Sequence, residues 1–216
     1  MNHLMNPSSR ITGIRTFFWS HHRWLAASLF VILASCSIVA SSAGTSRLSL
    51  PEPFFCSVEP ADDLGGLFLV PSEAPPPASQ ILVTVRNGSN NIIPDAVVSV
   101  TLTERNVVCG STILSGVTNS AGQVTLLLKG GGCAHQIPLS GLIKANGLTI
   151  RAYENVKSPD TNGDLKVDIR DLVMFSREFL EADPAECHDY NNDGVTGLPE
   201  LVLFGGVFTS AVSCSP

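Results

Sequence analysis

The sequence is poor in aromatic residues and in charge, and this scarcity limits the kinds of fold it can adopt. Aromatic side chains make up only 6% of the 216 residues and charged side chains 15%, whereas glycine occurs 18 times and proline 14 times. So many helix-breaking residues are unsuited to a long helical bundle but typical of β-rich domains with many turns. We therefore expect short strands joined by turns over most of the chain.

Basic residues are scarce as well. The chain has 13 Lys and Arg against 19 Asp and Glu, and residues 157–216 alone hold 11 acidic and 4 basic side chains. Everything before residue 157 is therefore close to neutral. Binding to nucleic acid needs a basic face that releases phosphate counterions, so the acidic C-terminal segment argues against it. The segment favours a metal cation as its partner.

Recognisable catalytic motifs are lacking too. No Ser/His/Asp or Cys/His set has supporting local context, and no Cys-x-x-Cys pair occurs. Gly130-Gly131-Gly132 is not followed by the Gly-Lys-Ser/Thr of a phosphate loop, so we expect a flexible break there. We predict that the protein is not an enzyme, and a small hydrolase within the β-rich region is the least favoured alternative.

Residues 1–43 have the pattern of an export signal. Arginines 10, 15 and 23 precede an apolar run over 24–34, which is too short to span a bilayer comfortably. Two processing sites compete: Ser-Ser-Ala at 41–43 suits signal peptidase, and Leu-Ala-Ser-Cys at 33–36 resembles a lipobox in which Cys36 is lipidated. An uncleaved membrane anchor is the third reading. We expect an extracellular or cell-surface protein, or an outer-membrane lipoprotein if Cys36 carries lipid.

The cysteine content favours an oxidising compartment. Beyond Cys36 the chain holds five cysteines, and an odd number leaves one without an intramolecular partner: Cys56, Cys109, Cys133, Cys187 and Cys214. The favoured pairs are Cys109 with Cys133 and Cys187 with Cys214, because each pair brackets one compact unit. Connectivity does not follow from sequence alone, and the role of Cys56 stays open.

Alternating apolar residues predict strands between residues 79 and 156. The runs 80–86, 96–103 and 123–129 are rich in β-branched residues, and 142–145 and 148–153 flank Asn146-Gly147, a strong hairpin signal. Such short strands, separated by turn signals, indicate an antiparallel sandwich. A proline-rich segment at 71–77 precedes it, so we interpret residues 44–78 as a linker or lead-in.

Two motifs in this region resemble bacterial Ig-like domains of the invasin/intimin type. They are Pro-Asp-Ala-Val-Val at 94–98 and Thr-Asn-Ser-Ala-Gly at 118–122. The resemblance implies an all-β Ig-like sandwich over 79–156, with a structural or adhesive role and no active site.

An internal repeat with an offset of 29 residues marks the C-terminal segment. Residues 160–172 align with 189–201, and the apolar residues that follow each loop also align: Leu172, Val173, Phe175 and Phe179 with Leu201, Val202, Phe204 and Phe208. Apolar residues at helical spacing predict a helix with one buried face after each loop. We expect the two helices to pack on each other through these residues, with His188 facing solvent.

The repeated loops have the spacing of calcium ligands. Calcium takes six to eight oxygen ligands, which a loop supplies from positions 1, 3, 5, 7, 9 and 12. The candidate ligands of the first loop are Asp160, Asn162, Asp164, the carbonyl of Lys166, Asp168 and Asp171. Those of the second are Asp189, Asn191, Asp193, the carbonyl of Val195, and Glu200. We predict two Ca²⁺ ions, with a left-handed residue at position 6 of each loop, Leu165 and Gly194.

This order of loop, helix, loop and helix over 158–210 resembles type I dockerin domains. The resemblance implies a small α-helical EF-hand-like pair at 157–216, following the sandwich, that docks onto a cohesin partner. The family often has Ser-Thr at its recognition positions, where this chain has Ile169-Arg170 and Leu198-Pro199, so the partner is left unknown. We predict an exported, non-catalytic calcium-binding scaffold or attachment module. The alternative is an Ig-like adhesin or glycan-binding domain with a calcium-rigidified C-terminal cap.

Overall fold

The computed structural model of the protein describes residues 49–109 and 111–213, which belong to one compact unit. The expected export signal at 1–43, Cys36 and Cys214 lie outside these residues. Among the helices that the structure describes, none has both the length and the apolar character needed to cross a membrane.

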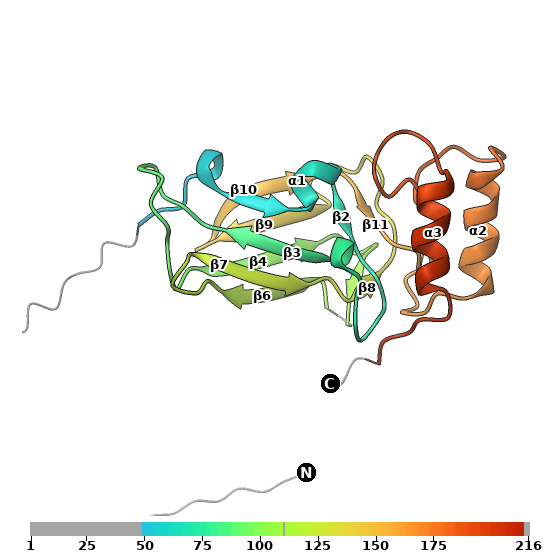
Figure 1. Ribbon diagram of the computed structural model, residues 1–216, viewed down its shortest axis with the longest axis horizontal. Helices are drawn as coiled ribbons and strands as arrows, with labels where there is room; N and C mark the ends of the chain where they lie inside the picture. The colour runs from blue at the N-terminus through green and yellow to red at the C-terminus, as the bar shows by residue number, and fades with distance from the viewer. Residues whose placement is uncertain (1–48, 110, 214–216) are drawn as a thin grey trace, which may run out of the picture. The chain divides into compact units, whose positions relative to one another are not determined.

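Two antiparallel sheets form the body of the unit (Figure 1). One has the order β1 (Ser57–Glu59), β3 (Gln80–Thr84) and β7 (Gln123–Leu127). The other has the order β10 (Leu148–Tyr153), β9 (Gly141–Ala145), β4 (Val97–Leu102) and β6 (Ile113–Val117). Alternate residues of these strands are buried between the sheets, among them Val58, Val83, Val100 and Ile143, which gives the main core.

Most of the predicted strands are present. The runs at 80–86, 96–103, 123–129, 142–145 and 148–153 correspond to β3, β4, β7, β9 and β10. Asn146 and Gly147 turn the chain between β9 and β10 with φ of 48° and 81°, and Leu148 pairs with Ala145 as the hairpin prediction requires.

Shorter elements lie where the sheets approach the C-terminal helices (Figure 1). Strand β2 (Leu67–Phe68) pairs in parallel with β11 (Val156–Lys157), and β5 (Val107–Val108) pairs with β8 (Gly130–Gly131). The expected flexible break at 130–132 is therefore wrong for Gly130 and Gly131, whose backbones form a strand. Helix α1 (Ala61–Leu64) and the 3-10 turn η2 (Pro77–Ser79) complete this part, whereas the 3-10 turn η1 (Pro53–Phe55) lies beside β10.

Each acidic loop leads into a helix. Helix α2 spans Ile169–Phe179 and α3 spans Leu198–Val207. Asp168 caps α2 by accepting a hydrogen bond of 2.8 Å from the backbone N–H of Arg170. The helices pack through Phe175 and Phe204, whose ring centroids are 4.8 Å apart.

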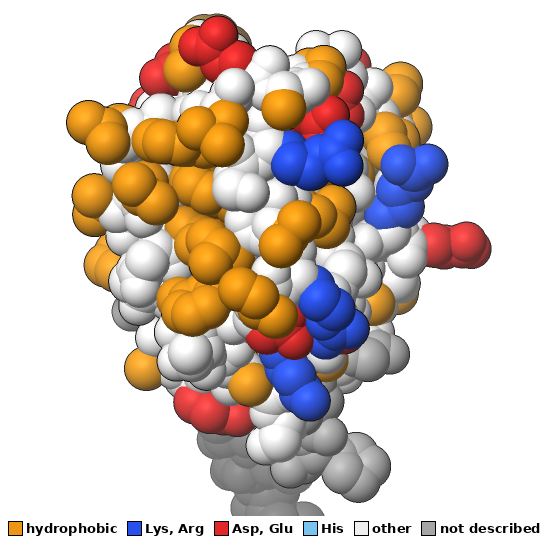
Figure 2. Space-filling view, turned by 90° about the vertical axis from the view of Figure 1, so that its right-hand side faces the viewer, with side chains coloured by type: hydrophobic (Ala, Val, Ile, Leu, Met, Phe, Trp, Pro, Cys, Tyr) orange, Lys and Arg blue, Asp and Glu red, His pale blue; other side chains and the backbone are white. Residues whose placement is uncertain are grey.

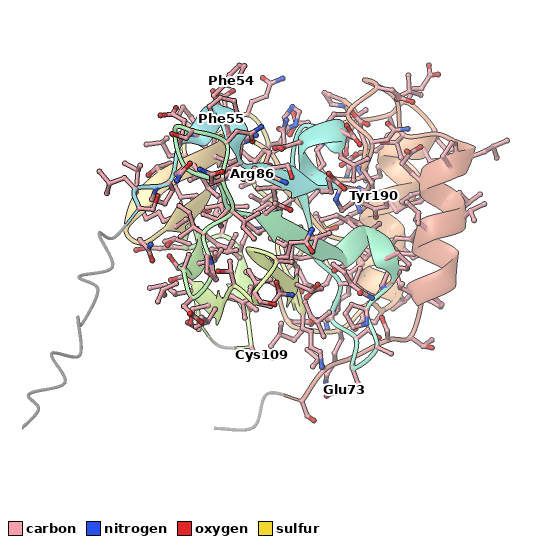
Figure 3. The ribbon with its side chains drawn as sticks, turned by 60° about the vertical axis from the view of Figure 1, so that its left-hand side comes forward. Phe54, Phe55, Glu73, Arg86, Cys109 and Tyr190 are labelled. Atoms are coloured by element: carbon pink, nitrogen blue, oxygen red, sulfur yellow. A yellow bond between two sulfur atoms is a disulfide. The ribbon has the colours of Figure 1, made fainter. Side chains whose placement is uncertain are left out.

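The helices share their core with the β part. One apolar cluster contains residues from the helical segment and from the β part. The helical segment supplies Val167, Phe175, Tyr190 and Phe204, and the β part supplies Phe68 of β2 and Val70 just after it. The rings of Phe68 and Tyr190 are 4.7 Å apart, and Tyr190 is seen between the strands and the helices in Figure 3. Residues 49–78 therefore belong to the fold, because they supply both β1 and the apolar floor under the helices.

The predicted fold class, an all-β Ig-like sandwich followed by a small α-helical EF-hand-like or dockerin-like pair, is wrong. The described residues are mostly β sheet with only three helices, and the β content agrees with the all-β part of the prediction alone. The helical pair is weak because α3 contains Gly205-Gly206, each of which costs about 1 kcal/mol relative to alanine. The helices also do not form their core by themselves, since Phe68 and Val70 complete it.

The predicted disulfide pairing is also wrong. Cys133 is bonded to Cys187, across a sequence separation of 54, so neither Cys109–Cys133 nor Cys187–Cys214 forms. Cys56 is buried and Cys109 partly buried, and neither is bonded to another cysteine within the described residues. Each predicted pair brackets one presumed compact unit. The pairing is wrong because the two presumed units belong to one compact unit, and the disulfide joins the two parts instead of closing a loop within either.

Candidate functional site

The two acidic loops have the same backbone conformation. Positions 4 and 6 are left-handed in both: Gly163 and Leu165 have φ of 73° and 65°, and Asn192 and Gly194 have φ of 58° and 90°. The predicted left-handed residue at position 6 is thus confirmed. Leu165 adopts it without the freedom of glycine, at a cost of about 1 kcal/mol. The sequence repeat is therefore a structural repeat.

The hydrogen bonds of the loops repeat as well. The first aspartate of each loop accepts N–H bonds from positions 5 and 6: Asp160 from Asp164 and Leu165 at 3.1 and 2.8 Å, and Asp189 from Asp193 and Gly194 at 3.1 and 3.0 Å. At position 3, Asn162 and Asn191 each accept a 2.9 Å bond from the N–H two residues ahead. At position 12, one carboxylate oxygen of Asp171 and of Glu200 accepts a 2.9 Å bond from position 9.

The loops differ in the second oxygen of the residue at position 12. In Asp171 that oxygen accepts a 3.0 Å bond from the backbone N–H of Thr161. In Glu200 the corresponding atom, Oε1, is buried and has no hydrogen-bond partner in the structure. A buried carboxylate oxygen without a donor is costly, and a bound cation removes that cost.

Asp160 lies against the β part. Its side chain is fully buried, and a Cβ added to Gly131 of β8 would stand 1.8 Å from its Oδ2, so only glycine fits there. Gly132 also donates a backbone bond of 2.6 Å to the carbonyl of Asp160. Burial raises the pKa of Asp160 to about 6, and the nearby carboxylates of Asp171 and Asp164 add to the rise. The charged form of Asp160 is therefore unfavourable unless a positive charge is close to it.

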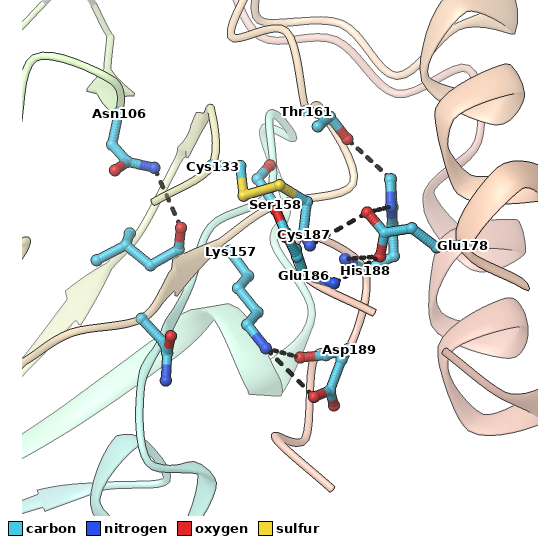
Figure 4. Close-up of a disulfide and its surroundings, with 12 residues drawn as sticks. Asn106, Cys133, Lys157, Ser158, Thr161, Glu178, Glu186, Cys187, His188 and Asp189 are labelled. Carbon is cyan, nitrogen blue, oxygen red and sulfur yellow. Dashed lines mark hydrogen bonds and ion pairs between the residues drawn. A yellow bond between two sulfur atoms is a disulfide. The ribbon is translucent and has the colours of Figure 1, made fainter. Parts of the chain in front are cut away.

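The second loop has a positive charge supplied by the β part. Lys157 of β11 is buried, with its Nζ 3.6 Å from Oδ2 of Asp189, and it also donates to the carbonyl oxygen of Asp189 (Figure 4). Burial lowers the pKa of Lys157, against the opposing pull of Asp189, Glu178 and Glu200.

A buried polar cluster holds the chain between the two repeats. Glu178 on α2 accepts backbone bonds from Glu186, Cys187 and His188 at 3.0 to 3.2 Å (Figure 4). The ring of His188 lies with Nδ1 3.0 Å from Glu178 and Nε2 2.8 Å from the hydroxyl of Thr161. His188 is fully buried and packs edge-on against Phe175, so the expectation that it faces solvent is wrong. Because Cys187 is disulfide-bonded, the cluster joins α2 to the disulfide.

The ionisation of Glu178 should make the stability of the fold depend on pH. Burial alone would raise its pKa, but bonding to His188 and the surrounding N–H groups lowers it from 4.5 to about 2. A carboxylate with a lowered folded-state pKa stabilises the fold above its unfolded pKa and loses that contribution as the pH falls through the folded value. We expect the natural protein to exceed Glu178→Gln in stability at pH 6. The gap should shrink progressively between pH 4.5 and 2.

The measurement is urea unfolding of both proteins across this pH range. Glu186→Gln is the control, because the side chain of Glu186 is exposed and only its backbone N–H donates to Glu178. A stability gap that stays constant from pH 6 to pH 2.5 would contradict the charge assignment of Glu178.

Apolar side chains are exposed on the helices. Figure 2 shows them gathered on the face of the molecule that carries α2 and α3. Val173 and Val202, predicted as repeated core residues, are instead 55% and 74% exposed, and Leu201 and Phe208 are each 38% exposed. Phe175 and Phe204 are buried as predicted, and Leu172 and Phe179 are partly buried. Helix α3 is therefore apolar on both its buried and its exposed sides, which is unusual for a surface helix.

The candidate calcium ligands fall into two sets. Those that the structure buries are Asp160, Asp171, Asp189 and Glu200, at positions 1 and 12. The other candidate ligands lie toward the surface: Asn162, Asp164, Lys166, Asp168, Asn191, Asp193 and Val195. Within the described residues, no three His, Cys, Asp or Glu side chains gather closely enough to hold a metal ion by themselves. The donor set mixes carboxylate, amide and carbonyl oxygens, a composition that suits calcium.

Arg170 lies at the outer rim of the first loop. Its guanidinium contacts the carboxylates of Asp164 and Asp168, at 2.8 Å in the latter case, while remaining 61% exposed. Hydrogen bonding from Arg170 lowers the pKa of Asp168. Such exposed pairs contribute little to stability, so these two carboxylates can exchange the arginine for another cation.

Sequence reasoning missed four residues that hold the loops in place. Gly131 of β8 and Lys157 of β11 contact the loops from the β part, and Glu178 of α2 and His188 hold the chain between the repeats. A glycine in a Gly-rich run and a lone lysine before an acidic loop carry no local signal of a distant partner. The one available hint was the position of Lys157 at the start of the acidic segment.

Comparison of the chain with protein-family models, with curated proteins and with solved structures gives no match.

Proposed function

We propose that the protein is an exported, non-catalytic calcium-binding attachment module, whose two loops each take one Ca²⁺ and whose helices contact a partner protein. The observation that carries this proposal is the buried, unpartnered Oε1 of Glu200, at the position where a calcium loop places its last ligand. The repeated hydrogen bonds of both loops support it, because they orient the same oxygen set twice.

The residues that would hold the ions are the two ligand sets given above. A bound Ca²⁺ supplies positive charge to carboxylates that are otherwise buried or crowded together. The N–H bonds to Asp160 and Asp189 fix these side chains in place before the metal arrives. Metal binding should therefore stabilise the folded protein, since an ion that binds only the native state at 100 times its Kd adds about 2.7 kcal/mol.

Calorimetric titration with CaCl₂ and thermal unfolding in calcium and in EDTA test the metal part. We expect two binding events and a higher melting temperature in calcium. Glu200→Gln should remove one event, whereas Glu186→Gln, which changes an exposed glutamate outside the loops, should remove none. A titration without heat, together with equal melting temperatures in calcium and EDTA, would falsify the proposal.

The exposed apolar face of the helices supports the attachment part. Leu198 and Val202 on α3 are 69% and 74% exposed, and Ile169 and Val173 occupy the equivalent positions of α2. Contiguous exposed apolar surface of this kind marks contact with another protein, and here it fits a partner surface that is itself apolar.

In the alternative, the β part binds the partner and the helices only cap the β part. The contacts of Lys157 with Asp189 and of Gly132 with Asp160, which join the β part to the loops, support it. The variants Leu198→Asp and Val202→Asp separate the two. Calcium-dependent retention of a partner should be lost in these variants and kept in Val97→Asp, which changes a 53% exposed valine of β4. Retention that survives in all three variants would favour the cap.

A further inference from the structure

Lys157 enters the second loop from outside the acidic segment. It lies on β11, opposite Phe68 of β2, and Leu69 donates a 2.9 Å bond to its carbonyl, so its backbone is fixed within the β part. Its ammonium group reaches Asp189, the first residue of the loop, at 3.6 Å from Oδ2 and by a hydrogen bond to the main-chain carbonyl. The side chains of Lys157 and Asp189 are only 3% and 5% exposed.

The first loop has no such buried cation. The carboxylate of Asp160 accepts backbone N–H bonds from Gly163, Asp164 and Leu165, and no lysine or arginine of the described residues lies within ion-pair distance of it. The nearest basic contact of this loop is Arg170, whose exposed side chain can turn away into solvent at little cost. Lys157 cannot turn away, because it is enclosed by the fold.

We infer that Lys157 is a resident counter-cation of the second loop: it holds that loop folded without calcium and makes it the weaker of the two calcium sites. The inference rests on the proposed function for the metal itself. It assigns the order of filling, with the loop of Asp160 taking calcium first.

The charges support this order. The first loop carries four carboxylates, at Asp160, Asp164, Asp168 and Asp171, whereas the second carries three, at Asp189, Asp193 and Glu200. The ammonium of Lys157 offsets one of those three and repels an incoming divalent ion at short range, where the intervening medium screens little. Without a metal, the same ammonium compensates the charge of the buried Asp189. Asp160 has no such compensating cation among the described residues.

Lys157→Met removes the cation while keeping the apolar stem. In calorimetry we expect this variant to bind calcium at the second loop about tenfold more tightly than the natural protein. Lys157→Arg, which keeps the charge, should retain the weaker site. Lys144→Met, which removes a lysine from β9, controls for net charge.

Amide hydrogen exchange in EDTA tests whether Lys157 holds the second loop folded when calcium is absent. In the natural protein, residues 189–196 should exchange more slowly than residues 160–167, and Lys157→Met should abolish that difference while Lys144→Met keeps it. If Lys157→Met does not fold in EDTA, recovery of the fold in calcium supports the inference. Failure in both conditions is resolved by Lys157→Met with Asp189→Asn, which removes both charges and should fold.

The outcomes separate the inference from the proposed function. Two calcium events of unchanged affinity in Lys157→Met, with unchanged exchange at 189–196, overturn the role of Lys157 and leave the calcium proposal standing. Absence of calcium binding in every variant removes the calcium proposal and the order of filling. The exchange comparison then decides alone whether Lys157 holds the loop.

Discussion

Replacing Cys133 and Cys187 together with alanine is expected to lower the free energy of unfolding by about 4 kcal/mol. The bridge closes a long loop, because its cysteines are separated by 54 residues, and chain-entropy arguments assign larger effects to longer loops. The loss is a large part of the total stability of a domain of this size.

The position of the disulfide adds a local effect. Cys187 stands two residues before Asp189, and its backbone N–H donates to Glu178 on α2, so the bond ties the second loop and helix α2 to the β part (Figure 4). Without it, the approach of Asp189 to Lys157 must be held by the remaining contacts alone. We therefore expect that removing the bridge speeds amide exchange at 187–196 more than in β9 (141–145) and β10 (148–153).

Guanidinium unfolding monitored by circular dichroism gives the stability, and Cys109→Ala serves as the control, because that cysteine forms no disulfide with a described residue. A double alanine variant within about 1 kcal/mol of the natural protein would contradict the prediction. It would mean that packing of Phe68 on Tyr190 holds the β part and the helices together without the bridge.

The left-handed residue at position 6 of each loop could be predicted because its determinants are local. Asp160 and Asp189 bond to N–H groups four and five residues ahead, so the spacing in the sequence already fixes the geometry. The same holds for the hairpin at Asn146-Gly147 and for strands such as β4, whose alternating residues have one buried face.

The joining of the β part and the helices could not be predicted, since its contacts link residues far apart in sequence. Phe68 and Val70 lie in a segment without a clear period, and nothing local indicates that they complete the core under α3. The disulfide failed for the same reason. Pairing within presumed units was reasonable, but residues of both presumed units form the core under the helices, and the bridge crosses between them.

That shared core leads to the second large effect. Replacing Phe204 with alanine should lower the free energy of unfolding by about 3 to 5 kcal/mol, the range for deleting a fully buried phenylalanine. Phe204 is 1% exposed, and its ring lies 4.8 Å from that of Phe175. Val202→Ala, two residues away on the same helix but 74% exposed, should change stability by no more than about 0.5 kcal/mol.

The shape of the transition decides whether the helices and strands form one cooperative unit. Because Phe68 lies in the same core as Phe204, Phe204→Ala should lower the midpoint of helix and sheet unfolding together, and Phe68→Ala should do the same from the β side. Far-ultraviolet circular dichroism reports both kinds of secondary structure, and amide exchange assigns the change to each. If α2 and α3 unfold first while β4 and β9 keep their protection, the helical pair is an appendage, and calcium at its loops would then stabilise the helices without stabilising the strands.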